Sequence, residues 1–171
     1  MNFRLFDQRL ASGVTLSCRG NGAPDTRWAD LPGYGYAAVA RDAKLRWQQV
    51  MADYLAYRHA LAGIVMLVDS RHGFTALDEQ LLRFIAARVG VGEVRLLVLL
   101  TKADKLGRAE AARALAQAQR VLGASTGLAT EHADIGVTLF SALTRQGVDD
   151  AAIALRAWRD ALAPAPAEVA A

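Results

Sequence analysis

At 171 residues, of which 53% are hydrophobic, the chain is long enough to bury one core and too short for two full domains. Its formal net charge of +3 permits a nucleic-acid partner without requiring one. The single cysteine, Cys18, excludes an internal disulfide, and no run of about 18 uncharged apolar residues could cross a membrane. With no secretory signal at the N-terminus, these features predict a cytoplasmic protein.

Strand-like and helical patterns alternate along the chain. A strand-like run leads into the turn ADLPGYGYA at 29–37, and a helical period follows over 41–60. Three short aliphatic runs have the composition of strands buried on both faces of a parallel sheet, at 63–69, 94–101 and 135–141. Further helices are predicted over 75–89, 108–122 and 149–162. In the first of these, Thr75 followed by Asp78 predicts a capping box.

This alternation predicts a doubly wound α/β domain with right-handed crossovers. Residues 1–162 form that domain in our interpretation, and the Ala/Pro-rich tail at 163–171 is expected to be disordered. Sheets of this class bind ligands beyond the carboxyl ends of their strands. Polar residues follow the strand-like runs at Asp30, Asp69, Thr101 and Ser141, so we expect four strand ends to converge on one rim.

The first chemical motif is ADLPGYGYA. Two glycines beside Pro32 indicate a turn whose backbone passes close to a ligand, and Asp30 at its start supplies a hard oxygen ligand. That combination is typical of a site for a phosphate and a metal ion.

The second motif is TKAD at 101–104. The carboxylate of Asp104 can accept hydrogen bonds from N1 and N2 of guanine, whereas adenine presents an acceptor at N1 and has no amino group at C2. The aliphatic stem of Lys102 can lie along the face of the base. Taken alone, the segment is also compatible with an ordinary polar turn between a strand and a helix.

Together, the motifs resemble the EngB (YihA) family of TrmE-Era-EngA-EngB-like GTPases over about residues 28–160. The resemblance rests on four segments in order: DLPGYGYA from Asp30, DSRHGFT from Asp69, TKADKL from Thr101, and FSA from Phe140. It implies a Ras-like P-loop GTPase domain with a parallel-dominated sheet and helices on both faces. It further implies binding of GTP or GDP with Mg²⁺, and roles in assembly of the large ribosomal subunit, cell division and septation.

The resemblance also assigns residues. Asp30 would hold Mg²⁺ through water, and Gly33 would sense the γ-phosphate. The nucleotide-binding set would be Asp30, Leu31, Pro32, Gly33, Thr101, Lys102, Ala103, Asp104, Phe140, Ser141 and Ala142. The implied partners are a guanine nucleotide and the large ribosomal subunit or its rRNA, without membrane or DNA.

No catalytic residue is assigned. Tyr34 stands where many GTPases carry the glutamine that orients the attacking water, so we expect slow intrinsic hydrolysis. His72 is interpreted as a surface-loop residue.

One departure from the family pattern is large. The chain has no G-x-x-x-x-G-K-[ST] segment, which in the family follows the first strand and wraps the phosphates. MNFRLF at 1–6 resembles the family's second strand, and RWADLPG its third, so the first strand, phosphate loop and first helix are lacking. Because that first strand is interior, either the sheet pairs differently or the chain is incomplete. A truncated gene or start site and a relative without the phosphate loop both remain open.

An alternative function is a degenerate or truncated G domain that binds ribosome or RNA without turning over nucleotide. Its phosphate contacts would be arginines and a lysine on helical segments and loops, although these residues also suit plain solvated faces. They are Arg41, Lys44, Arg46, Arg58, Arg71, Arg108, Arg113 and Arg120.

Overall fold

The computed structural model describes residues 2–7, 15–18, 26–30, 53–55, 57–126 and 134–162, the first three segments as backbone. Its elements are β1 (Asn2–Asp7), β2 (Thr15–Cys18), β3 (Thr26–Asp30), β4 (Leu61–Asp69), α2 (Ala76–Gly90), β5 (Arg95–Thr101), the 3-10 turn η1 (Ala103–Lys105), α3 (Arg108–Thr126), β6 (Ile135–Leu139) and α4 (Val148–Ala161).

The three predicted aliphatic strands are confirmed as β4, β5 and β6, and three predicted helices as α2, α3 and α4. Of the helix predicted over 41–60, the structure describes 53–55 and 57 as helical. The tail at 163–171 lies outside the described residues.

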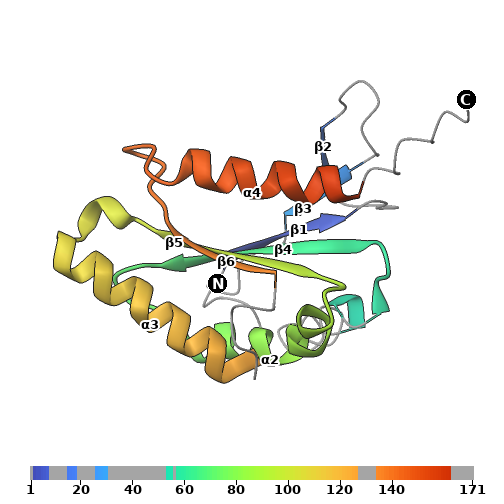
Figure 1. The fold of residues 1–171 in the computed structure, drawn as a ribbon, viewed down its shortest axis with the longest axis horizontal. Helices are drawn as coiled ribbons and strands as arrows, with labels where there is room; N and C mark the ends of the chain where they lie inside the picture. Colours follow the sequence, from blue (N-terminus) through green and yellow to red (C-terminus); the bar gives the residue numbers. More distant parts are fainter. Residues whose placement is uncertain are drawn as a thin grey trace, which may run out of the picture.

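The described strands form one six-stranded sheet in the order β2-β3-β1-β4-β5-β6. Helices α2 and α3 cover one face, and α4 covers the other (Figure 1). Each face has its own apolar core, one beneath α2 and α3 and one around Trp158 of α4. This three-layer arrangement is the α/β class that the sequence predicts.

Burial on both faces explains the continuous apolar runs of β4 and β5. Residues 61–66 of β4 and 96–100 of β5 are all buried. No position in these runs faces water. Gly63 has a packing role, because a Cβ at this position would lie 2.4 Å from the Trp158 ring. The glycine therefore lets the indole lie directly on the strand.

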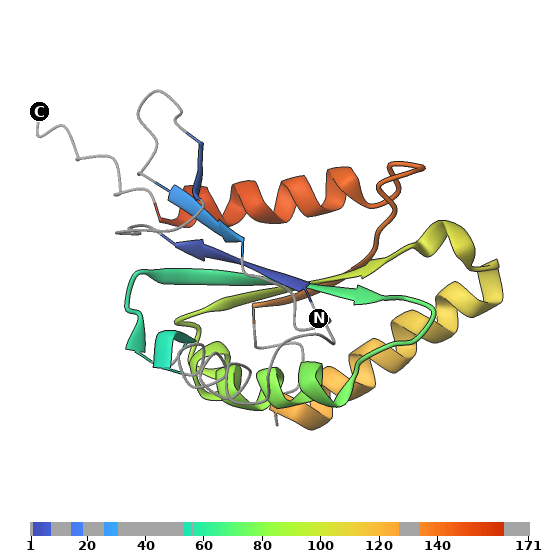
Figure 2. The same cartoon turned by 180° about the vertical axis from the view of Figure 1, so that it is seen from behind.

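The N-terminal strand takes an interior position in the sheet. MNFRLF resembles the family's second strand, and we expected the sheet either to pair differently or to be incomplete. In the structure, β1 lies between β3 and β4, antiparallel to both (Figure 2), while β2 is the edge partner of β3. The interior position is filled because two unpaired ladders in a sheet core would leave many backbone groups without partners.

The direction of β1 matters for the rim where the predicted site lies. Asn2 pairs with Leu67 near the carboxyl end of β4, so the amino end of β1 faces this rim. A parallel strand in the same position would instead deliver its carboxyl end and the loop that follows it. The ladders β4·β5 and β5·β6 are parallel, as predicted.

Helix α2 begins with the predicted capping box, which is confirmed. The Asp78 amide donates to Thr75 Oγ1 at 3.3 Å, and the Thr75 amide donates to Asp78 Oδ2 at 2.8 Å. Thr75 Oγ1 also donates to Asp78 Oδ2 at 2.7 Å. These bonds satisfy amides that the first helical turn leaves without intrahelical partners. Within the described residues, no helix is both long and apolar enough to span a membrane.

Thr75→Ala is expected to lower the free energy of unfolding by about 1 kcal/mol, because the cap hydroxyl is lost and the buried Asp78 loses a donor. Thr75→Ser keeps the hydroxyl and is the matched control. Urea denaturation followed by circular dichroism measures both variants. Equal midpoints for the two would show that the capping box contributes nothing.

Candidate nucleotide-binding site

The carboxyl ends of β4, β5 and β6 meet side by side at one rim of the sheet. Asp69 at the end of β4 pairs with Thr101 at the end of β5, and Leu100 pairs with Leu139 of β6. The expected convergence is therefore observed for these three strands. Strand β3 runs in the same direction as β4 because both are antiparallel to β1.

Part of the predicted site lies outside the described residues. Asp30 ends β3, where its backbone is described and its side chain is not. Leu31, Pro32 and Gly33 lie outside the described residues, as does Tyr34. The described part of the site comprises the segments that follow β5 and β6.

Asp104 and Ser141 form the centre of this part. They come from the turns after neighbouring strands, and the Ser141 hydroxyl donates to Asp104 Oδ1 at 2.6 Å. The same hydroxyl oxygen accepts from the Thr144 amide at 3.2 Å, so the serine itself is held in place. Lys105 Nζ lies 3.4 Å from Asp104 Oδ2. The carboxylate is thus oriented from both sides at the rim.

This environment keeps Asp104 ionised. The hydrogen bond from Ser141 lowers the pKa of the Asp104 carboxyl below its ordinary value, and Lys105 acts in the same direction, while burial opposes them. An ionised carboxylate only accepts hydrogen bonds, and its two oxygens offer about four lone-pair positions. Asp104 therefore keeps capacity for a ligand edge that carries two adjacent N–H donors.

Backbone bonds join the two turns. The Ala103 amide donates to the Phe140 carbonyl at 3.1 Å, and the Phe140 amide donates to the Leu100 carbonyl at 2.8 Å. Phe140 packs against the core on the α4 side, and Ala103 is buried. Ala142 is exposed. These contacts fix the TKAD turn to the FSA turn.

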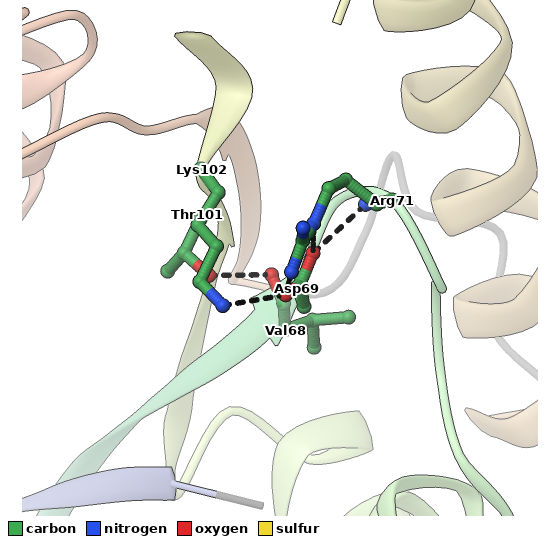
Figure 3. Close-up of polar contacts among 5 residues, drawn as sticks. All are labelled: Val68, Asp69, Arg71, Thr101 and Lys102. Atoms are coloured by element: carbon green, nitrogen blue, oxygen red, sulfur yellow. Dashed lines mark hydrogen bonds and ion pairs between the residues drawn. The ribbon is translucent and has the colours of Figure 1, made fainter. Parts of the chain in front are cut away.

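The remaining two residues of TKAD bond toward β4 rather than toward Asp104. Thr101 Oγ1 donates to the Val68 carbonyl at 3.1 Å, and Lys102 Nζ lies 2.9 Å from Asp69 Oδ2. Figure 3 shows Asp69 between Lys102 and Arg71. Arg71 makes a bidentate pair with the same carboxylate, with Nε at 2.9 Å and Nη2 at 2.7 Å. Asp69 therefore links the loop after β4 to the loop after β5.

Lys102 adopts the left-handed backbone conformation, with φ of 59°. A side chain other than glycine, asparagine or aspartate is uncommon there and is strained by roughly 1–2 kcal/mol. The ion pair with Asp69 offsets part of that strain and directs the lysine stem across the rim.

Asp69→Asn is expected to destabilise the fold in a pH-dependent way. The hydrogen bond from Arg71 is the largest cause that lowers the pKa of Asp69 well below its usual range, with Lys102 adding to it. A carboxyl whose pKa is lower in the folded state stabilises the folded protein at pH values above the unfolded-state pKa of about 4. This stabilisation is lost as the pH falls from there through the folded-state pKa. The stability difference between wild type and Asp69→Asn should be constant from pH 6 to 8 and shrink below about pH 4.

Urea denaturation at a series of pH values measures this difference. Glu79→Gln, which removes an exposed carboxylate that only approaches Arg83 at 3.9 Å, is the control. A gap between wild type and Asp69→Asn that stays unchanged down to pH 2 would contradict the assignment.

Two features of the site were missed by sequence reasoning. Ser141 was placed in the nucleotide-binding set, but the bond by which its hydroxyl orients Asp104 was not foreseen; its amide donates to the Gln146 carbonyl. Asp69 was predicted to lie at the rim, but its pairing with Lys102 was not foreseen. His72 is exposed, as predicted, and its amide donates to the Asp69 carbonyl.

The described residues do not by themselves form a metal centre, since they contain no group of three or more His, Cys, Asp or Glu side chains suited to hold an ion. The magnesium prediction depends on Asp30, whose side chain is not described. The polar groups of the described turns fit the base of a nucleotide.

Solved structures support the class of fold. A crystal structure described as a probable GTP-binding protein EngB matches with a TM-score of 0.57 at 11% identity, covering 91% of this chain and 88% of that one. A bacterial selenocysteine-specific elongation factor matches with a TM-score of 0.56 at 16% identity, covering 86% of this chain and 22% of that one. The protein therefore has the fold of a Ras-like P-loop GTPase domain.

Curated sequences show a stronger similarity. The probable GTP-binding proteins EngB of Acidovorax ebreus and Albidiferax ferrireducens are 52% and 49% identical to this chain over 137 residues. The match covers 80% of this chain and 58% and 61% of those proteins, so the chain spans about three fifths of their length. No family model matches. Over 137 residues, the chain is therefore similar to proteins described as probable GTP-binding proteins EngB.

Proposed function

We propose that this chain carries the guanine-recognition half of an EngB-type GTP-binding site. Asp104 accepts hydrogen bonds from N1 and N2 of the base, and the Lys102 stem lies along one face of the base. The turn at 140–142 borders the base beside Asp104. The bond between the Ser141 hydroxyl and Asp104 Oδ1 carries this proposal, because it holds an ionised carboxylate in a fixed orientation where three strands end.

We expect these 171 residues to bind the phosphates of a nucleotide much more weakly than a domain with a phosphate loop does. They contain no G-x-x-x-x-G-K-[ST] segment, and the rim position next to β4 is taken by the amino end of an antiparallel strand. We propose that Asp30 and Gly33, with Leu31 and Pro32, contact the phosphates and a water-bridged Mg²⁺ as in the family. Without the phosphate loop, those contacts supply only a small part of the usual affinity.

Titration of the purified chain with GDP and with ADP, each with Mg²⁺, tests this function. Base contacts alone supply a few kcal/mol, so we expect GDP to bind with high-micromolar to millimolar affinity. ADP should bind more weakly, because its N1 acceptor faces the Asp104 carboxylate. Equal binding of the two nucleotides would contradict guanine recognition. Submicromolar GDP binding would show that phosphate recognition comes from other residues.

The cellular role follows the family in our proposal. Assembly of the large ribosomal subunit in the cytoplasm, with a link to cell division and septation, is supported by the similarity to EngB proteins over 137 residues. Binding of the chain to large-subunit particles should weaken as salt rises if arginine contacts to rRNA phosphates contribute. Co-sedimentation at two salt concentrations measures this.

A further inference from the structure

A cavity of about 320 Å³ lies apart from the base-reading turns, between the loop that follows β4 and helix α3. Its apolar lining includes Leu100 of β5, Phe74 and Ala114, and its polar lining includes Ser70, Arg113 and Gln117. None of residues 101–105 or 140–142 lines it. A cavity of this size falls at the lower end of the range for small-molecule sites, about 300–1,000 Å³.

Small residues on one stripe of α3 leave this space open. Ala114 and Ala118 lie one helical turn apart and both line the cavity, with Arg113 and Gln117 beside them on the same face. A bulkier aliphatic residue at 114 would extend into the cavity, which makes the space easy to fill by substitution. The exposed alanine at 116 does not line it.

The polar groups around the cavity are not all used by the protein. Ser70 is 7% exposed, and its buried hydroxyl has no hydrogen-bond partner among the described residues. Such groups are rare in native proteins, and an enclosed water is the partner that suits a hydroxyl oxygen buried in this way. Glu110 is already used, since it accepts from the Gly107 amide at 2.8 Å.

Of the two arginines that line the cavity, one has a carboxylate partner and the other has none among the described residues. Arg71 is paired with Asp69, whereas Arg113 is exposed and makes no ion pair within the described part of the chain. Glu110 also lines the cavity, but it already accepts from the Gly107 amide. Arg113 is therefore a cation at the mouth of the cavity that is available to an anion.

We propose that this cavity binds a nucleoside phosphate in addition to the guanine site, with its base against the apolar lining and its phosphate at Arg113. A flat heterocycle suits an apolar slot with few polar groups, and a phosphate is the anion that guanidinium groups bind best. The Gln117 amide can donate to or accept from the edge of the base. The same chemistry is presented by a free nucleotide and by an unstacked residue of single-stranded RNA.

Amide chemical-shift titrations of the full chain test the proposal with three probes: cytidine monophosphate, inorganic phosphate and a short oligouridine. Cytidine lacks the guanine edge that Asp104 reads, so it reports on the cavity. We expect cytidine monophosphate to shift the amides of Ser70 and Ala114. Binding should weaken at least about five-fold in Ala114→Leu, which fills the cavity, and in Arg113→Ala, which removes the cation.

Matched variants on α3 are the controls. Ala116→Leu and Arg120→Ala change exposed residues that do not line the cavity and should leave binding unchanged. Because Arg113 is exposed, Arg113→Ala keeps the test valid if Ala114→Leu fails to fold.

The three probes separate the outcomes. Binding of the mononucleotide identifies a free nucleotide as a sufficient ligand, and binding of oligouridine alone with the same dependence on Arg113 and Ala114 identifies RNA. The proposal is overturned if neither binds, if the control variants weaken binding as much as the cavity variants, or if inorganic phosphate binds as tightly as the nucleotide.

Discussion

Gly147→Ala is expected to destabilise the protein by at least about 3 kcal/mol, a large part of the total stability of an ordinary domain. Gly147 precedes α4 with φ of 71°, and a Cβ there would lie 2.0 Å from the carbonyl oxygen of Leu139. That contact is with backbone, so no side-chain rotation relieves it. The segment 141–147 would have to move, and with it the Ser141 hydroxyl that orients Asp104.

Gly92→Ala separates the clash from the backbone strain. Gly92 also has a positive φ, of 74°, but nothing lies within 4 Å of a Cβ there. We expect this control to lose only about 1 kcal/mol, the strain of a left-handed alanine. Urea denaturation of both variants measures the difference. A Gly147→Ala protein as stable as Gly92→Ala would show that the turn after β6 rearranges freely.

The second large effect is expected on ligand choice. In Asp104→Asn, one acceptor of the carboxylate becomes an N–H donor that faces the 2-amino group of guanine, so guanine binding should fall roughly ten-fold or more. Xanthine carries an N1–H donor and a carbonyl acceptor at C2, which complement the acceptor and donor of an asparagine amide. The substitution is isosteric and keeps an oxygen for the Ser141 hydroxyl, so the fold should be unaffected.

The sequence predicted the elements that are buried on both faces and the motifs that lie within a few neighbouring residues. Strands β4 and β5 are covered on both faces, which produces unbroken aliphatic runs that no exposed element would carry. The capping box of α2 uses residues three apart, so it is visible in the sequence without any tertiary information. The base-reading role of Asp104 was likewise predicted from a short motif, and it remains a proposal.

The position of β1 could not be predicted in the same way. A short alternating strand fits an edge or an interior position, and the choice depends on pairing with residues about 60 positions away, such as Phe3 with Met66. The resemblance matched MNFRLF to the family's second strand and left the pairing of the sheet open. Long-range pairing of the sheet decided the outcome.

The side-chain contacts within the site were also beyond sequence reasoning. Lys102 reaches Asp69 because the residue has a left-handed backbone, a conformation that its sequence neighbours do not indicate. The link between Ser141 and Asp104 joins two turns 37 residues apart. Both contacts depend on the parallel register of β4, β5 and β6, which brings the three strand ends to one level.

Titration of wild type and Asp104→Asn with GDP, xanthosine diphosphate and ADP tests the central claim most directly, namely that Asp104 reads the base. The account predicts that wild type prefers GDP and that Asp104→Asn prefers xanthosine diphosphate, with an affinity close to that of wild type for GDP. ADP should bind both proteins weakly. An Asp104→Asn protein that keeps the wild-type preference for GDP over xanthosine diphosphate would contradict the account.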